Sequence, residues 1–196
     1  AGWLVSDEAF MKKLSWVSLL KLRGSYGVIG NNNIGNYTQY NTINITKGGV
    51  FGSTVVNGSQ VTNLGNSNLG WEKTKQLDLG IDFSFLNNRI NVTLDMYKTK
   101  TEGVIWKKSL PVVNGSYSSK EQYLTNINLC ETKNKGLELA LNTRNIETKN
   151  FQWTSALTFA YNKEEITKLT GTANDKVING DYTYAVGSAI NSFYHY

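Results

Sequence analysis

Residues 74–100 read TKQLDLGIDFSFLNNRINVTLDMYKTK and carry the clearest structural pattern in the chain. Large apolar residues occupy every second position over residues 77–85, and the same spacing returns over residues 90–96. A period of two places these side chains on one face of a strand, whereas a helix would spread them around its axis. Between the two halves, Asn87 and Asn88 tolerate the positive φ of a tight turn. The stretch therefore predicts an antiparallel hairpin.

The strands of this hairpin are unusually long. Each arm is roughly twice the usual strand of about 5 or 6 residues, and close to the roughly 9 to 11 residues that a tilted strand needs to cross a bilayer core. Similar alternation appears over residues 20–28, 135–142 and 151–161. The 18 glycines, the 12% of aromatic residues and the single proline suit strands joined by turns better than a helical bundle. We expect an all-β protein with five long strands.

A short helix or helical turn is expected before the first of these strands. Ser6 precedes the acidic residues Asp7 and Glu8, and the basic residues Lys12 and Lys13 follow. Serine is a favoured N-cap, and this order of charges complements a helix dipole.

The connections between the strands alternate in length. Residues 30–70, 101–134 and 162–196 are long and lack sustained alternation, whereas residues 86–89 and 143–150 are short. In an antiparallel sheet of sequential strands, this order puts every long connection at one end. Soluble sandwiches mix their connections between both ends through Greek-key crossings. The pattern therefore favours a transmembrane β-barrel, with long extracellular loops and short periplasmic turns, over a soluble β protein.

Two sets of residues within this pattern have structural expectations of their own. Turn signals in the long connections stand at Gly48-Gly49, Asn57-Gly58, Asn114-Gly115, Gly171 and Asn179-Gly180. Aromatic residues that would mark a membrane interface stand near strand ends, at Tyr26, Phe85, Tyr97, Phe151, Trp153 and Tyr161.

Composition excludes several other classes of protein. The net charge of +5 could suggest nucleic acid, but no basic run is interleaved with aromatic residues, and we expect no nucleic-acid partner. Cys130 is the single cysteine and cannot form an internal disulfide, and no Cys or His cluster has metal-ligand spacing. No apolar run reaches the roughly 18 residues of a transmembrane helix. A search for such runs does not detect β-barrels, because only alternate residues of their strands face lipid.

Candidate catalytic groups have simpler interpretations. His195 is the single histidine and has no neighbouring Asp-Ser or second His arrangement that would give it a catalytic role, so it is interpreted as a loop residue. Asp78, Asp82 and Asp95 could suggest a glycosidase pair, but they fall on the polar side of adjacent strands, where a barrel interior requires polar groups. The triplet Asn91-Val92-Thr93 lies inside a strand and reflects abundant Asn and Thr rather than a glycosylation acceptor. No catalytic, cofactor-binding or metal-binding residue is predicted, so we do not expect an enzyme.

Aromatic side chains in the long connections have two interpretations. They could stack on sugar rings, or they could pin the connections to one another. The sequence favours neither, so residues that contact substrate are not assigned. The side chains concerned are Tyr37, Tyr40, Trp106, Tyr117 and Tyr123.

Several stretches resemble one family. LKLRGSYGVIGNNNIGNY (residues 20–37) and LGNSNLGWEKTKQLDLGIDFSFLNNRINVTLDMYKTKT (residues 64–101) are similar to the SusC/RagA family of TonB-dependent outer-membrane transporters. GWLVSDEAFM, NKGLELALNT and NFQWTSALTFAYNKEEITKL match in the same order, so the resemblance covers nearly the whole chain. VGSAINSFYHY is similar to a family segment that usually carries Pro at the position of Ala189 and Gly at those of Asn191 and His195.

The resemblance implies a barrel of about 22 strands with a plugged lumen. It implies import of a nutrient such as an oligosaccharide or peptide across the outer membrane of a diderm bacterium, with energy delivered through TonB. It also implies a SusD-like surface lipoprotein over the long loops. Residues 1–196 would form one partial barrel domain, without the plug, the TonB-contacting segment and the remaining strands. The alternative is a secreted or surface carbohydrate-binding module.

The barrel hypothesis predicts the polarity of each face and the state of the sheet edges. Leu77, Leu79, Ile81 and Phe83 should face lipid, and Gln76, Asp78 and Asp82 should face inward. Five strands cannot close a barrel, so the strands near residues 20–28 and 151–161 should leave open edges of a curved wall. A soluble domain would instead bring apolar residues from all the strands into one core, namely Leu79, Ile81, Leu94, Leu139 and Leu157.

Overall fold

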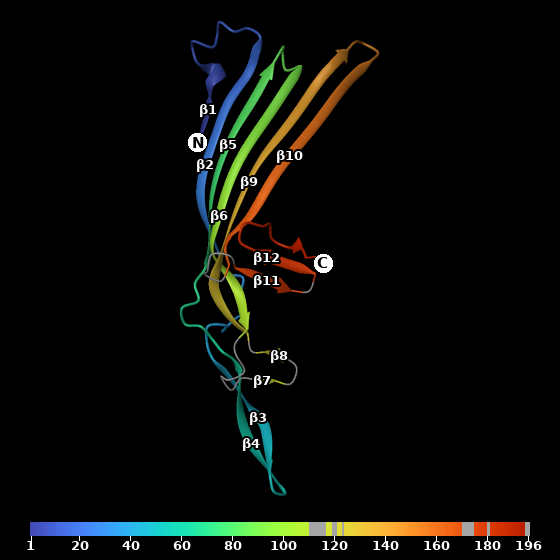
Figure 1. Ribbon diagram of the computed structural model, residues 1–196. Coiled ribbons are helices and arrows are strands. Elements are labelled where there is room, and N and C mark those ends of the chain that lie inside the picture. Colours follow the sequence, from blue (N-terminus) through green and yellow to red (C-terminus); the bar gives the residue numbers. More distant parts are fainter. Residues whose placement is uncertain (110–116, 119–120, 123, 170–174, 180, 195–196) are drawn as a thin grey trace.

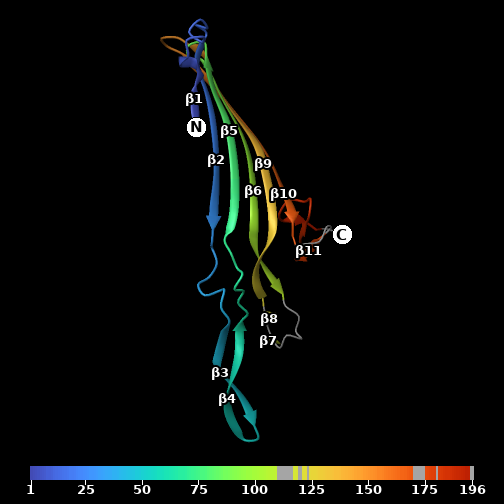
Figure 2. The same ribbon diagram turned by 90° about the vertical axis from the view of Figure 1, so that its left-hand side faces the viewer.

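The computed structural model describes residues 1–109, 117–118, 121–122, 124–169, 175–179 and 181–194, and most of them form one curved antiparallel sheet (Figures 1 and 2). The order of its six strands is β1-β2-β5-β6-β9-β10. Five of them are the expected long strands, and in Figure 2 they form a single thin layer. Their bounds are β2 (Val17–Asn31), β5 (Glu72–Phe85), β6 (Ile90–Ser109), β9 (Leu124–Glu147) and β10 (Gln152–Lys168).

The central hairpin is formed as predicted. β5 and β6 pair in one unbroken register from Phe85↔Ile90 to Lys73↔Glu102. Asn87 and Asn88 have φ of 55° and 60°, as expected, and Leu86 adopts the same left-handed conformation with φ of 53°. The two short connections lie together at one end of the wall and the long ones lead from the other end, as the alternation of lengths predicted (Figure 1).

The strands extend further than the apolar alternation indicated. β6 and β9 remain paired up to Ser109↔Leu124, so the long connection predicted over residues 101–134 shrinks to residues 110–123. Pairing continues there because backbone hydrogen bonds and polar contacts, such as the 3.2 Å ion pair between Lys100 of β6 and Glu131 of β9, need no apolar face. Apolar periodicity ends before the ladder does.

The helical turn expected near the N-terminus is present, but the N-cap expected at Ser6 is wrong. β1 (Gly2–Leu4) pairs with β2, and η1 (Val5–Asp7) is a single 3-10 turn that contains Ser6 instead of being capped by it. Further single turns follow, in which the Met11 amide bonds the Glu8 carbonyl and the Leu14 amide bonds the Met11 carbonyl. Each closes only three residues, so no α-helix propagates.

The first long connection contains a ribbon that the sequence did not predict. β3 (Thr42–Phe51) and β4 (Thr54–Asn63) form a two-stranded ladder beyond the wall (Figure 1). Its turn lies at Gly52, with φ of 63°. Gly48-Gly49 and Asn57-Gly58, expected as turns, lie within the strands instead, where Gly48 pairs with Asn57. The sequence does not predict the ribbon because neither of its faces is buried, as the exposed apolar side chains of both strands show. A strand with no buried face does not need the alternation of apolar and polar residues that marks a strand in a sequence.

The C-terminal stretch, expected to be irregular, forms a second small sheet. Its strands are β11 (Lys176–Asn179), β12 (Tyr182–Ala185) and β13 (Ser192–Phe193). Backbone bonds join it to β10, from the Ile166 amide to the Ser188 carbonyl and from the Gly187 amide to the Ile166 carbonyl. Two further short strands are β7 (Tyr117–Ser118) and β8 (Glu121–Gln122). Asn114-Gly115, Gly171, Gly180, Tyr123 and His195 lie outside the described residues.

The core that a soluble domain would need does not form. Leu79 and Leu157 are 48% and 57% exposed, and Ile81 is 37% exposed. A small buried cluster of Cys130, Ile166 and Leu169 lies instead where the C-terminal sheet meets the wall. The described residues include no helix long and apolar enough to cross a membrane.

The edges of the wall are open, with one correction. β1 covers part of the outer edge of β2, through Gly2↔Arg23 to Leu4↔Lys21. The edge strand on that side is therefore β1, not the strand predicted over residues 20–28. On the other side, none of the described strands pairs with the outer edge of β10.

Candidate functional site

The face that carries Leu77, Leu79, Ile81 and Phe83, which we call the outward face, is apolar across all five long strands. The row through Ile81 shows this, because directly paired residues share a face. Its members are Leu22, Ile81, Leu94, Leu139 and Phe159. From Phe85 to Leu77 the band runs about 27 Å along the strand, or about 20 Å in height at a tilt of about 40°. This height approaches the lipid-facing band of transmembrane barrels.

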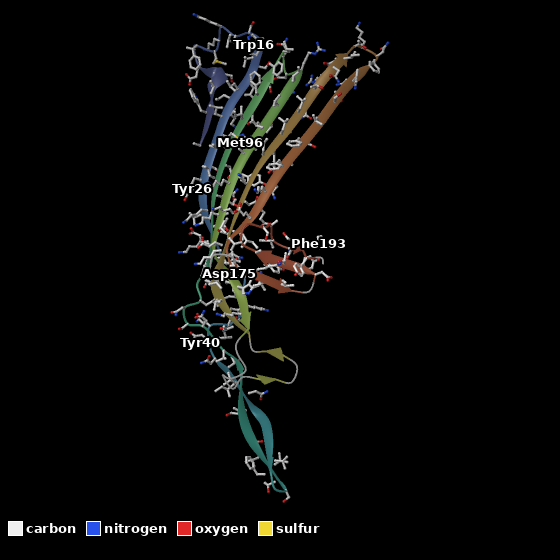
Figure 3. All side chains as sticks on the ribbon, viewed as in Figure 1. Trp16, Tyr26, Tyr40, Met96, Asp175 and Phe193 are labelled. Atoms are coloured by element: carbon white, nitrogen blue, oxygen red, sulfur yellow. The ribbon has the colours of Figure 1, made fainter. Side chains whose placement is uncertain are left out.

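Aromatic residues lie toward both ends of the outward face. At the end of the short connections, the Trp16 ring packs edge-on against Phe83 at 6.2 Å, and Phe83 stacks on Phe85 at 5.1 Å. Tyr26 is 68% exposed and lies toward the opposite end, so the two labelled rings Trp16 and Tyr26 are far apart along the wall (Figure 3). Such girdles are typical of barrels at membrane interfaces. Tyr97, expected among the interface residues, instead pairs with Asp78 on the opposite face of the wall.

The opposite face, which we call the inward face, joins its strands through polar side chains. The Arg23 guanidinium donates to both carboxylate oxygens of Asp82, at 2.8 and 3.0 Å. It also lies 2.8 Å from the Asp95 carboxylate, so one arginine of β2 binds acids on β5 and β6. The Ser25 hydroxyl donates to Asp78 at 2.9 Å. The three predicted aspartates thus share the polar face, each held by a structural partner or network.

Two glycines leave room for these side chains to cross a strand. A Cβ on Gly80 would meet the Asp95 carboxylate and lie 2.6 Å from Cζ of Arg23. A Cβ on Gly136 would lie 2.5 Å from the Tyr97 hydroxyl, which donates across β9 to the Asn162 side chain at 3.0 Å. The sequence alone did not identify Arg23 and Gly80. Once the register is known, Arg23 is seen to pair with Gly80, which stands between Asp78 and Asp82 on the same face, and this arrangement indicates an ion pair across the glycine.

An open hollow of about 620 Å³ lies where the wall meets the long connections. Its lining is mainly polar and includes Tyr37, Glu72, Lys107 and Asn126. Tyr37 is 75% exposed and has φ of 62°, an uncommon conformation for a bulky residue. Non-glycine residues in such conformations cluster at functional sites.

Hydrogen bonds hold this end of the wall in shape. Glu72 accepts from the Ile105 amide at 2.8 Å and from the Asn31 side chain at 2.9 Å. The Asn128 side chain donates to the carbonyls of Gly70 and Gly103 at 2.8 and 2.7 Å, and accepts from the Gly70 amide. These clamps join segments distant in sequence, which is why sequence analysis missed Asn128.

The aromatic residues of the long connections divide between the two interpretations. Trp106 packs against Tyr184 at 5.3 Å between ring centres, and so pins the C-terminal sheet to the wall. Tyr37 and Tyr40 keep exposed rings, at 75% and 57%. The side chains of Tyr117 and Tyr123, like His195, lie outside what the structure describes.

Comparisons with known proteins agree with this architecture. The family described as TonB dependent receptor-like, beta-barrel, matches residues 3–192. The TonB-dependent receptor SusC of Bacteroides thetaiotaomicron is 35% identical over 211 residues, covering 100% of this chain and 20% of the relative. TonB-dependent receptor P39 of Formosa agariphila is 33% identical over 195 residues, covering 100% of this chain and 18% of the relative.

A solved structure of the RagAB peptide importer in the closed-closed state has a TM-score of 0.80 at 27% identity, covering 98% of this chain and 20% of that one. The chain thus spans about a fifth of the length of these relatives. With an apolar outward face, a bridged polar inward face and matches along nearly its whole length, the chain is a β-barrel segment that belongs to the TonB-dependent receptor family, of the SusC/RagA type.

Proposed function

We propose that this chain forms part of the barrel wall of an outer-membrane transporter that imports a nutrient. The observation that carries the proposal is the opposition of two faces on long strands with open edges. The outward face is apolar over about 20 Å in height, which approaches the lipid-facing band of a barrel. The inward face is joined across three strands by Arg23, Asp82 and Asp95. Closure by further strands of the same protein would satisfy the edges of β1 and β10.

Each part of the wall then has a place in the membrane. The outward face contacts lipid, and the inward face contacts water or a plug in the lumen. The short connections face the periplasm and the long connections face the cell exterior. The plug and the segment that contacts TonB belong to other parts of the receptor.

The long connections are the parts of this chain available to cargo and to a SusD-like lipoprotein. The hollow beside Tyr37 has hydrogen-bonding groups and an exposed ring, which suits an oligosaccharide or a peptide. The neighbour RagAB is a peptide importer, and this supports a peptide as one of the two cargo classes. Transport needs no catalysis by this chain, and Asp82 and Asp95 are already bound by Arg23.

Uptake by the full-length receptor tests this proposal. The receptor should fractionate with the outer membrane, need detergent to stay monodisperse, and support uptake of fluorescently labelled oligosaccharides or peptides. Tyr37→Ala should lower uptake about two- to tenfold, the range of one aromatic contact. Tyr26→Ala, which removes an exposed ring from the outward face, is the matched control and should leave uptake unchanged. A full-length protein that stays soluble and monodisperse without detergent would contradict the proposal.

A further inference from the structure

Three lysines stand side by side on the outward face. Lys98 of β6 is directly paired with Lys135 of β9, which is directly paired with Lys163 of β10. All three side chains are exposed. We call these residues the lysine row.

Acidic side chains of the described residues do not reach the lysine row, although Glu165 lies on the same face, two residues from Lys163. Like charges directly opposite on neighbouring strands destabilise a sheet. Among the described residues, none of the three lysines forms an ion pair, so the sheet keeps an arrangement that repels itself. An anionic group from outside this part of the chain would offset the repulsion.

The lysines one step further toward the long connections are arranged differently. Lys75 and Lys100 lie 2.8 and 2.7 Å from Glu102, and Lys100 also lies 3.2 Å from Glu131. Hydrogen bonds from Lys100 and Lys75 lower the pKa of Glu102 to about 2, so this carboxylate stays ionised at neutral pH. Acidic neighbours thus offset Lys75 and Lys100, which lie further from the apolar band, but within the described part of the chain no such ion pair is formed by the lysine row.

The lysine row lies at the border of the apolar band. Each lysine lies two residues, or about 7 Å along its strand, from an outward-facing residue of the band. The neighbours are Met96 for Lys98, Leu137 for Lys135 and Tyr161 for Lys163. At such a border, the aliphatic stem of a lysine can lie along lipid while its ammonium group reaches the polar interface. The opposite border of the band carries the aromatic residues Trp16, Phe83 and Phe85.

We propose that the lysine row binds the phosphate groups of anionic lipid headgroups, in the leaflet on the side of the long connections. The proposal rests on the membrane location under Proposed function. Three ammonium groups spread over about 10 Å, two strand spacings, and over about 6 Å in depth at a strand tilt of about 40°. Each brings three hydrogen-bond donors to the headgroup region. The positive charge of the lysine row thus complements the negative charge of headgroup phosphates, and those phosphates supply the anionic partners that the sheet itself does not.

The test uses the full-length receptor in neutral detergent, titrated with phosphatidylglycerol or phosphatidylcholine and followed by native mass spectrometry. The variant K98Q/K135Q/K163Q removes the charge, and K98R/K135R/K163R keeps it. K12Q/K13Q/K149Q removes three exposed lysines at the end of the short connections and serves as the matched control. Heat-dependent gel mobility verifies that every variant is folded.

The wild type, the Arg variant and the control should bind phosphatidylglycerol more tightly than phosphatidylcholine. The Gln variant should lose at least roughly tenfold in affinity for phosphatidylglycerol, since each lysine near an anionic surface contributes about fivefold. Added salt should weaken the binding. A folded Gln variant with wild-type preference, or a detergent-requiring wild type with no preference, would overturn the lysine row alone. A wild type that needs no detergent would overturn the proposed function instead.

Discussion

Side chains on the inward face reach past their nearest neighbour because glycine leaves the space. Arg23 lies over Gly80 and contacts carboxylates of two different strands, and Tyr97 lies over Gly136 in the same way. Such contacts join every second strand in addition to the backbone ladder. The wall is therefore stiffened across its width by single residues.

Gly80→Ala should destabilise the full-length receptor by about 1 to 3 kcal/mol, because the new methyl displaces Arg23 from Asp95. Urea unfolding of the lipid-reconstituted receptor measures this change. Gly27→Ala is the matched control, since a Cβ there meets no atom within 4 Å. Equal stability of the two variants would show that Arg23 has no need of the space over Gly80.

Cys130 should react slowly with alkylating reagents in the folded receptor. Burial raises the pKa of its thiol to about 11, from an ordinary value of 9.0, so the reactive thiolate is about a hundredfold scarcer near neutral pH. The contribution of this thiol to the free energy of unfolding is constant below pH 9. It falls as the pH rises from 9 toward 11, because the thiol ionises in the unfolded chain before it does in the folded one. Peptide-resolved mass spectrometry after iodoacetamide treatment should show labelling at pH 8 only in denaturant. Rapid labelling of the native protein would place Cys130 outside the buried cluster.

At the scale of the element, the two faces of each long strand differ in polarity, the outward face being apolar and the inward face polar. β10 displays the contrast in adjacent residues, since Phe159 is 53% exposed on the outward face and Thr158 belongs to the inward face. The hairpin β5–β6 shows the same alternation on both arms. Strand polarity is thus a local property that each strand carries by itself.

Phe159→Arg should cost about 2 to 4 kcal/mol in the lipid-reconstituted receptor, because the charge would lie at the centre of the apolar band. Thr158→Arg, one residue away on the inward face, should cost much less. Urea titration in phosphatidylcholine vesicles compares the two free energies of unfolding. Equal costs on both faces would overturn the assignment of lipid and lumen.

At the scale of the whole molecule, the backbone groups at the two edges of the wall need further strands as hydrogen-bond partners. β1 covers only three residues of β2, and the described part of the chain has no strand against the outer edge of β10. In hydrocarbon, each unpaired backbone group costs several kcal/mol. Closure must therefore come from the rest of a barrel.

Residues 1–196 expressed alone should not fold, because the open edges outweigh the roughly 5 to 15 kcal/mol that stabilises a typical domain. Heat-dependent gel mobility after refolding into detergent measures this, with the full-length receptor as the positive control. A cooperative, monodisperse fold of the isolated segment would contradict the open wall.

The sequence by itself determined the five long strands, the tight turn at Asn87 and Asn88, the segregation of connections and the polarity of each face. These features depend on residues close together in the chain or on a period of two, both of which can be read without a partner.

Tertiary structure alone decided the ribbon β3–β4, the C-terminal sheet, and the full extent of β6 and β9. It also decided which residues lie opposite one another. The bridge from Arg23 to Asp95 and the lysine row depend on the register between strands that long connections separate, β2 from β5 and β6 from β9. Period-two alternation allows several registers between such strands, and a long connection does not select one as a tight turn does. For the same reason, the hollow beside Tyr37 and its clamp at Asn128 appear only when separate connections meet in space.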